Sequence, residues 1–396
     1  MSDISRRDFV ADVAKASAAF TIVPRHVLGG PGYRAPSDTL NVACVGVGGM
    51  GRSDVNGVSG ENIVAMCDVD DRMAEQSYAR FPARKKYRDF RQMLEREGKG
   101  IDAVTVSTPD HTHTVIAMAA MRMGKHVYVQ KPLARTIHEV RTLMDAARRY
   151  KVATQMGNQG HAGVGTRNLR EWVEAGAIGT VREIQYWTNR PIWPQAIERP
   201  TELHPPPPTL DWDLWLGPAA DRPYHPAYAP FRWRGWWDFG TGALGDIAPH
   251  AMDAAYWALN LGFPSRIEAE TTRNFPETAP RVSRIVYEFP ARGSRPPVRV
   301  VWRDGELSAP RPEALPPEQP WPYHDVGSQM WIGTDGTLVA DAYGDRLIHL
   351  DPARHKDLTA SPPPQKYPGV AGVYAEWIAA CKGGPAAGSN FPEHAG

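Results

Sequence analysis

The sequence has few cysteines, almost no net charge and no long apolar run. Its three cysteines, Cys44, Cys67 and Cys381, lack metal-ligand spacing, and this odd number of scattered thiols predicts reduced side chains and no disulfide framework. The net charge of +1 gives no electrostatic reason to expect binding to nucleic acid or to an anionic membrane. No apolar stretch approaches the roughly 20 residues that cross a bilayer, so we expect no stable membrane insertion.

The N-terminus carries a pattern of its own. The segment Ser5-Arg6-Arg7-Asp8-Phe9-Val10 resembles the twin-arginine export signal, and a weakly apolar run follows it. We therefore expect residues 1–37 to be a signal and linker, with export by the twin-arginine machinery and a periplasmic location. The alternative is an amphipathic N-terminal helix with an incidental arginine pair, which would leave the protein in the cytoplasm.

A glycine-rich turn lies between two short apolar runs, the second of which ends at Asp68. Gly46, Gly48 and Gly51 form a G-x-G-x-x-G pattern. In such a turn the first glycine permits the tight bend, the second lets the backbone approach a pyrophosphate, and the third lets helix and strand pack closely. Asp68 follows about 20 residues later, where a carboxylate binds the adenosine ribose hydroxyls. This context predicts dinucleotide binding, with NAD favoured over NADP.

Short apolar strands alternate with amphipathic helical patterns from residue 39 to about residue 160. This alternation predicts an α/β domain over residues 38–160 with a doubly wound parallel sheet, the Rossmann architecture. The expected strands are 40–45, 63–67, 103–107, 127–129 and 153–156, and the clearest helices are 114–123 and 137–149.

Strand-like runs dominate the rest of the chain. They follow a helix expected at 247–261 and predict an open, mainly antiparallel sheet in an α+β domain over residues 161–396. We expect long loops at 303–328 and 353–368, a last helix at 372–382, and no closing strand or cap before Gly396, which suggests an incomplete C-terminus. The expected strands are 181–188, 266–272, 283–289, 298–302, 329–332, 337–341 and 346–350.

Four motifs together resemble the Gfo/Idh/MocA oxidoreductases, the relatives of glucose–fructose oxidoreductase and inositol dehydrogenase. They are the glycine turn with Asp68, Thr108-Pro109-Asp110-His111, Gln130-Lys131-Pro132 and Gly245-Asp246-x-x-x-His250-x-x-Asp253. The family usually shows Glu-Lys-Pro at the third motif, so Gln130 departs from the pattern while the lysine remains. The resemblance covers nearly all of the chain after residue 38 and implies a nicotinamide-dependent oxidoreductase, often assembled as a homo-oligomer through its open sheet.

The resemblance implies that Lys131 contacts the reacting oxygen and that His250 is the general acid/base. A cation beside that oxygen would stabilise developing alkoxide charge. Asp246 and His250 are four residues apart on one helical face, where the carboxylate can orient the ring or raise its pKa. The alternative is that Asp246 caps the helix and His250 is a packed polar residue. Asp253 shares this face, but no third ligand joins Asp246 and His250 in the sequence, so we expect no metal there.

The same resemblance places Thr108, Pro109 and His111 beside the nicotinamide end of the cofactor. Pro132 could adopt a cis peptide bond and so fix the direction of the preceding lysine. For His113, helix capping and solvation is an equally good interpretation.

Tryptophan is dense between residues 187 and 257. Flat aromatic faces suit the C–H faces of sugar rings, although a loop-rich region can also use tryptophan as its core. We expect an enzyme with a tightly held NAD that interconverts a hydroxyl and a carbonyl on a sugar or polyol. The alternatives are an NAD-dependent glycosidase that oxidises its substrate transiently, and a non-catalytic sugar-binding protein. The tryptophans are Trp187, Trp193, Trp212, Trp215, Trp233, Trp236, Trp237 and Trp257.

Overall fold

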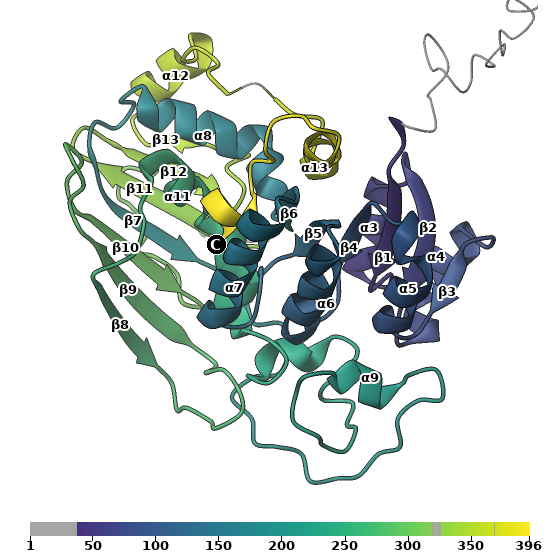
Figure 1. Ribbon diagram of the computed structural model, residues 1–396. Helices are drawn as coiled ribbons and strands as arrows, with labels where there is room; N and C mark the ends of the chain where they lie inside the picture. Colours follow the sequence, from purple (N-terminus) through teal and green to yellow (C-terminus); the bar gives the residue numbers. More distant parts are fainter. Residues whose placement is uncertain (1–37, 316, 319–320, 322–325, 368) are drawn as a thin grey trace, which may run out of the picture. The chain divides into compact units, whose positions relative to one another are not determined.

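Six parallel strands form the first of two sheets (Figure 1). The computed structural model describes residues 38–396 apart from 316, 319–320, 322–325 and 368, and residues Asn41–Gly396 form one unit. The Arg6-Arg7 motif therefore lies outside the described residues. Within the described ranges, no helix combines the length and apolar character needed to cross a membrane.

The order of the first sheet is β3-β2-β1-β4-β5-β6, which confirms the expected Rossmann architecture. The chain reverses direction across the sheet between β1 and β4, and ligands of doubly wound folds bind outside the strand ends at this switch point. The strands are β1 (Asn41–Val45), β2 (Asn62–Cys67), β3 (Lys85–Tyr87), β4 (Ala103–Val106), β5 (His126–Gln130) and β6 (Thr154–Gly157). The helices are α3 (Met50–Gly57), α4 (Asp71–Arg80), α5 (Phe90–Glu97), η2 (Gly98–Gly100), α6 (Asp110–Arg122) and α7 (Ile137–Tyr150).

The second sheet has seven strands in the order β13-β12-β11-β7-β10-β9-β8. All neighbours are antiparallel except β7 and β10, which are parallel, so the expected mainly antiparallel sheet is confirmed. The strands are β7 (Val181–Trp187), β8 (Arg266–Thr271), β9 (Ser283–Phe289), β10 (Val298–Arg303), β11 (Ser328–Gly333), β12 (Thr337–Asp341) and β13 (Ile348–His349).

Helices α8 and α11 pack beside each other on one face of this sheet (Figure 1). Leu169, Ile247 and Ala254 from the helical side are buried with Val300 and Trp302 of β10, which forms the core of the second domain. The helices and short turns of this half are η3 (Gln159–Ala162), α8 (Val164–Glu174), α9 (Trp212–Leu216), η4 (Arg232–Gly235), α10 (Gly242–Ala251), α11 (Asp253–Leu259), α12 (Pro352–Ala360) and α13 (Val373–Cys381).

Two sequence expectations about helices are wrong. The helix expected at 247–261 is a pair, α10 and α11, and α10 begins five residues earlier, at Gly242. The two glycines at its start read as a loop because glycine disfavours helix, yet tertiary packing overrides that preference. The loop expected at 353–368 contains α12, whose N-terminus is capped when the Asp351 side chain accepts the N–H groups of Ala353 and Arg354.

The C-terminal segment returns to the first sheet. Its last turn, η5 (Phe391–Ala395), begins at Asn390, whose side chain accepts the N–H of Glu393. Phe391 is fully buried in the core of the first domain, and its N–H donates to the hydroxyl of Thr154 at 3.0 Å. The expectation that no capped element precedes Gly396 is therefore wrong.

Candidate active site

A cavity of about 390 Å³ opens where strands β1, β2, β4 and β5 end. Its lining includes the glycine turn, Asp68, Thr108 and Pro109 from the first domain. Asp246 and several aromatic residues line it from the second domain. The cavity thus joins most of the residues that the sequence motifs single out, at the strand ends where doubly wound folds bind ligands.

The glycine turn has the geometry that its pattern predicts. Gly46 has φ of 73°, and a Cβ on Gly51 would lie 1.9 Å from the carbonyl oxygen of Gly46, so neither position accepts a side chain without strain. Gly48 lies against Met73 of α4, where a Cβ would approach within 2.7 Å. Gly49 lines the cavity at the start of α3 and has no atom within 4 Å of an added Cβ, which leaves the helix N-terminus open to a phosphate.

Asp68 points back at the glycine turn. Its Oδ2 accepts the N–H of Val47 at 2.8 Å and of Gly48 at 3.2 Å, and its Oδ1 accepts the N–H of Asp70 at 3.0 Å. Burial raises the pKa of this carboxyl although these donors act in the opposite direction. The carboxylate therefore holds the turn in shape and also lines the cavity at the end of β2.

Lys131 and Asp246 meet inside the cavity. The Nζ of Lys131 donates to the Oδ1 and to the main-chain oxygen of Asp246, both at 2.9 Å. The Nε of Arg234 donates to the same Oδ1 at 3.1 Å. Both the lysine and the aspartate side chains are only 12–13% exposed. Burial opposes ionisation of Asp246, but Lys131 and Arg234 together hold its pKa below the usual range, so the site contains a fixed ionised cluster. The Lys131–Pro132 peptide bond is cis, as the sequence suggested.

Gln130 satisfies a buried carboxylate. Its Nε2 donates to the two oxygens of Asp54 at 2.9 and 3.1 Å, and Asp54 also accepts the hydroxyl groups of Ser107 and Tyr374. A glutamate at position 130 would place a second carboxylate against Asp54, which would be repulsive. The departure from the usual Glu-Lys-Pro pattern therefore has a local electrostatic reason.

Asp110, the third residue of the Thr108-Pro109-Asp110-His111 motif, is a further residue of the site. It is 4% exposed, lines the cavity, and its Oδ2 accepts the hydroxyl of Thr241 at 2.9 Å. Burial and the neighbouring Asp246 raise its pKa to about 7, against the opposing effect of Lys131. A carboxyl group with this pKa can exchange a proton near neutral pH.

His250 is held by Asn158 and makes no hydrogen bond to Asp246. Its Nδ1 lies 3.0 Å from the Oδ1 of Asn158, and its ring packs edge-on against Tyr343. Burial, then Lys131, lowers the pKa of His250 to about 3, and these effects outweigh Asp246, which acts in the raising direction that the sequence suggested. A neutral ring that donates from Nδ1 to the amide oxygen keeps a lone pair on Nε2 and can accept a proton there. His250 itself lies outside the cavity lining.

His111 is not among the residues that line the cavity. Its ring is 1% exposed, packs against Trp215 and Phe239, and contacts the main-chain oxygen of Trp215 at 3.0 Å. Burial lowers the pKa of His111 to about 4, and its place beside the nicotinamide stays a prediction of the family resemblance. Thr108 and Pro109 do line the cavity.

Neither Gly51 nor Pro132 lines the cavity.

His113 is fully buried, which contradicts the interpretation as a solvated side chain. Its ring nitrogens lie 2.9 Å from the carbonyl oxygen of Pro132 and 2.8 Å from that of Thr108. The His113 ring thus ties together the two turns that carry Thr108 and Lys131.

The tryptophans divide between core and cavity wall. Trp236 is fully buried in an aromatic cluster, as the core interpretation expects. Trp215 and Trp233 line the cavity together with the half-exposed Phe231. The guanidinium of Arg234 lies 4.3 Å from the centre of a Trp233 ring and 4.5 Å from that of Phe231. A flat aromatic wall therefore stands beside the Lys131 cluster.

Residues 40–158 match a family described as an oxidoreductase family with an NAD-binding Rossmann fold, GFO_IDH_MocA, and residues 165–295 match its C-terminal alpha/beta domain. The chain belongs to the Gfo/Idh/MocA family. This confirms the resemblance based on the four motifs and agrees with the two observed sheets.

Curated relatives align over part of the chain. A levoglucosan dehydrogenase of Pseudarthrobacter phenanthrenivorans is 26% identical over 217 residues, 54% of this chain and 46% of the relative. A glycosyl hydrolase family 109 protein of Solibacter usitatus is 36% identical over 126 residues, 28% of each chain. The aligned part thus spans less than half of either relative. The WlbA dehydrogenase from Bordetella pertussis, solved with NADH and UDP-GlcNAcA, shares the fold with a TM-score of 0.61 at 17% identity, over 90% of this chain and 92% of its own.

Proposed function

We propose that this member of the family is an NAD-dependent oxidoreductase that interconverts a hydroxyl and a carbonyl on a sugar or polyol. The observation that carries the proposal is the meeting of Lys131 with Asp246 in the cavity that also contains the glycine turn. A dinucleotide with its pyrophosphate on that turn would extend along the strand ends toward Lys131. The names of relatives that act on levoglucosan and inositol support a sugar or polyol as substrate.

The residues present fit such a cofactor, because the glycine turn leaves the start of α3 open and Asp68 lines the adenosine side of the cavity. When bound, NAD accepts or returns the hydride. Lys131 donates to the substrate oxygen and stabilises its developing negative charge. Asp246 and Arg234 hold the lysine in place. The family resemblance assigns the hydroxyl proton to His250, whose Nδ1 contact with Asn158 leaves Nε2 as the acceptor, and this role requires the ring to reach the substrate from outside the cavity lining.

The test of this function uses a panel of sugars and polyols that includes levoglucosan and inositol, with the appearance of reduced cofactor as the signal. Lys131→Met and His250→Ala should each lower turnover by roughly 10²–10⁴-fold, the usual scale for electrostatic and acid–base groups. Cofactor affinity should stay near normal. The matched controls Lys99→Met and His138→Ala alter exposed side chains and should keep full turnover. Near-normal turnover in both site variants would remove the proposed catalytic roles.

A glycosidase that oxidises its substrate transiently is the second candidate. The glycosyl hydrolase family 109 relative supports it, and so does Asp110, whose pKa of about 7 would let it protonate a leaving group. Hydrolysis of a nitrophenyl glycoside that needs NAD but forms no net reduced cofactor would favour this reaction over the dehydrogenase.

We also propose export to the periplasm with the cofactor already bound, because Arg6-Arg7 precedes a dinucleotide-binding domain and the twin-arginine pathway reads that pair. Replacement of both arginines by lysine should leave the protein in the cytoplasm, as measured by cell fractionation. Wild-type protein isolated from the periplasm should contain nicotinamide cofactor, and its removal should lower the melting temperature. Wild-type protein found in the cytoplasm would leave a cytoplasmic enzyme, and a Lys-Lys variant that still reaches the periplasm would show that this pair does not direct export.

Self-association is a further part of the proposal. All six residues of β8 are exposed, and Ile267, its second residue, is 58% exposed. This apolar side chain at the free edge of the second sheet supports a homo-oligomer, whose size sedimentation would measure.

A further inference from the structure

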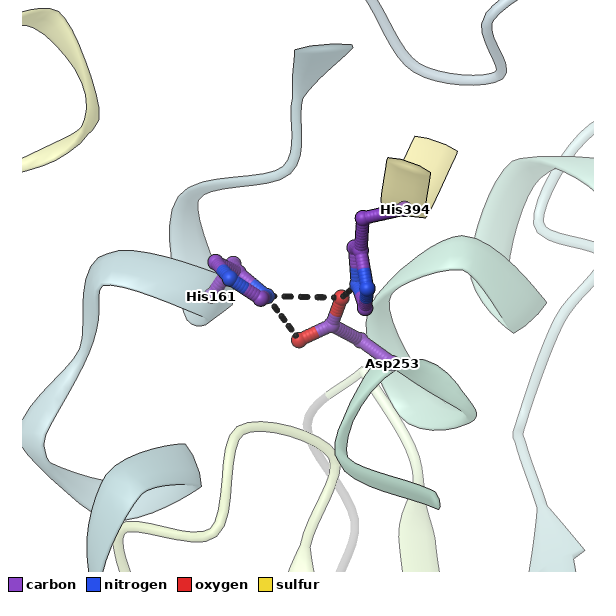
Figure 2. A group of neighbouring side chains, drawn as sticks. All are labelled: His161, Asp253 and His394. Carbon is purple, nitrogen blue, oxygen red and sulfur yellow. Dashed lines mark hydrogen bonds and ion pairs between the residues drawn. The ribbon is translucent and has the colours of Figure 1, made fainter. Parts of the chain in front are cut away.

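Three buried side chains from distant parts of the chain converge outside the cavity (Figure 2). His161 comes from η3, Asp253 is the first residue of α11, and His394 lies in the C-terminal turn η5. Their side chains are 1%, 2% and 14% exposed. Figure 2 shows both imidazole rings directed at the one carboxylate between them.

The distances within this cluster suit a metal ion. The Nδ1 of His161 lies 3.1 and 3.0 Å from the two oxygens of Asp253, and the Nε2 of His394 lies 2.6 Å from Oδ1. One ligand atom from each residue lies within 4.8 Å of the others. Zinc binds histidine nitrogen and carboxylate oxygen at about 2.0–2.2 Å, which places tetrahedral ligands about 3.3 Å apart. A small outward adjustment of the side chains would therefore admit a zinc ion.

The surroundings of His161 also favour a metal. A Cβ added at Gly388 would lie 2.7 Å from Nε2 of His161 and 3.2 Å from Oε1 of Glu376, so Gly388 leaves room between this ring and a carboxylate that is also paired with Arg167 at 3.9 Å. The other oxygen of Glu376 is buried and has no hydrogen-bond partner among the described residues. Histidines that bind a metal through one ring nitrogen usually donate the other ring N–H to a carboxylate or carbonyl oxygen, and Glu376 lies in the neighbourhood of the Nε2 of His161.

We propose that His161, Asp253 and His394 bind one divalent transition-metal ion, with zinc the best fit and a water as the fourth ligand. Two imidazoles and one carboxylate form a ligand set that zinc commonly uses. None of the three residues lines the cavity, so the ion has a structural role and takes no part in the hydride chemistry.

The position of this site explains what the ion would stabilise. Asn158, which holds His250, precedes His161 by three residues, and His250 precedes Asp253 by three. The ion would therefore fix both segments that position the His250 ring. It would also hold the C-terminal turn, whose Phe391 lies in the core of the first domain.

The experiment measures metal in full-length protein purified without a histidine tag. The protein is stripped with a chelator, incubated with zinc, dialysed and analysed by elemental mass spectrometry. We expect one equivalent in the wild type and a higher melting temperature than in the stripped form. His394→Gln should weaken zinc binding by at least about 10-fold and remove the effect of zinc on melting. The matched control His138→Gln changes an exposed histidine and should behave as wild type.

Cobalt provides a second measurement that separates a lost ligand from a misfolded variant. The visible absorption of tetrahedral Co²⁺ should appear in the wild type and not in His394→Gln, while both proteins keep the same NAD affinity. Wild-type protein that retains no zinc and melts at an unchanged temperature would overturn the proposal and leave a cluster held by hydrogen bonds alone. Equal zinc retention in His394→Gln would equally overturn it.

Discussion

Asp110→Asn tests the electrostatics of the cavity without knowledge of the substrate. The carboxyl of Asp110 is buried beside Asp246, and these two effects raise its pKa from 3.8 to about 7. Between these two pH values the folded chain keeps a proton that the unfolded chain releases. Asp110 therefore makes its own pH-dependent contribution to the free energy of unfolding.

The sign and size of the effect follow from the two pKa values. Below pH about 3.8 both states are protonated and Asp110 costs no stability. The cost grows as the pH rises through this window and is complete above about pH 7. About three pH units at about 1.4 kcal/mol each correspond to a cost on the order of 4 kcal/mol. Asparagine does not titrate, so the variant escapes this cost and adds only a constant from its altered contact with Thr241.

The assay is urea unfolding of the NAD-free protein, followed by tryptophan fluorescence from pH 4.5 to pH 8.5. The stability of Asp110→Asn relative to wild type should rise with pH and level off above pH 7. The control Asp145→Asn alters a carboxylate that is 81% exposed and should give a flat difference. In a Lys131→Met background the rise should extend to higher pH, because Lys131 lowers the pKa of Asp110. A difference between Asp110→Asn and wild type that does not change with pH would refute the reasoning.

Two further predictions concern cofactor choice and acid stability. Asp68 should repel a 2′-phosphate, so NAD should bind more tightly than NADP. Asp68→Ala should reduce this preference, and it should also weaken NAD binding because the bonds to Val47 and Gly48 are lost. Tighter binding of NADP than of NAD by the wild type, measured by fluorescence titration, would contradict this role of Asp68. Burial lowers the pKa of His111 from 6.5 to about 4, so its contribution to stability is complete above pH 6.5 and is lost as the pH falls toward 4. His111→Phe should therefore lose less stability than wild type over that interval, and equal losses in urea unfolding would show that His111 does not titrate as described.

The first sheet could be predicted closely because its central strands are buried on both faces and read as unbroken apolar runs. The strand expected at 40–45 is Asn41–Val45, and the one expected at 103–107 is Ala103–Val106. Strand β3 was missed because Lys85–Tyr87 is short and polar and lies at the sheet edge. Such a strand carries no apolar pattern, and only pairing with β2 reveals it.

Part of the candidate site could likewise be predicted from the sequence, and part could not. The family resemblance implied that Lys131 and Asp246 belong to one site, and the structure brings them within 2.9 Å. The resemblance could not indicate the contact of Arg234 with Asp246, nor the role of Asn158 in holding His250. The raised pKa of Asp110 was equally hidden, because it arises from burial by residues far away in the sequence.

The proposed zinc site was hidden for the same reason, because its ligands are far apart in the sequence. Metal motifs are recognised when two ligands lie a few residues apart on one element. Here each ligand comes from a separate segment, with 92 residues between His161 and Asp253 and 141 between Asp253 and His394. The sequence predicts that Asp253 shares a helical face with Asp246 and His250. The helix is interrupted between α10 and α11, however, and the Asp253 carboxylate contacts His161 and His394 instead. A metal site assembled only by tertiary folding leaves no local trace, so its discovery depends on the packed structure.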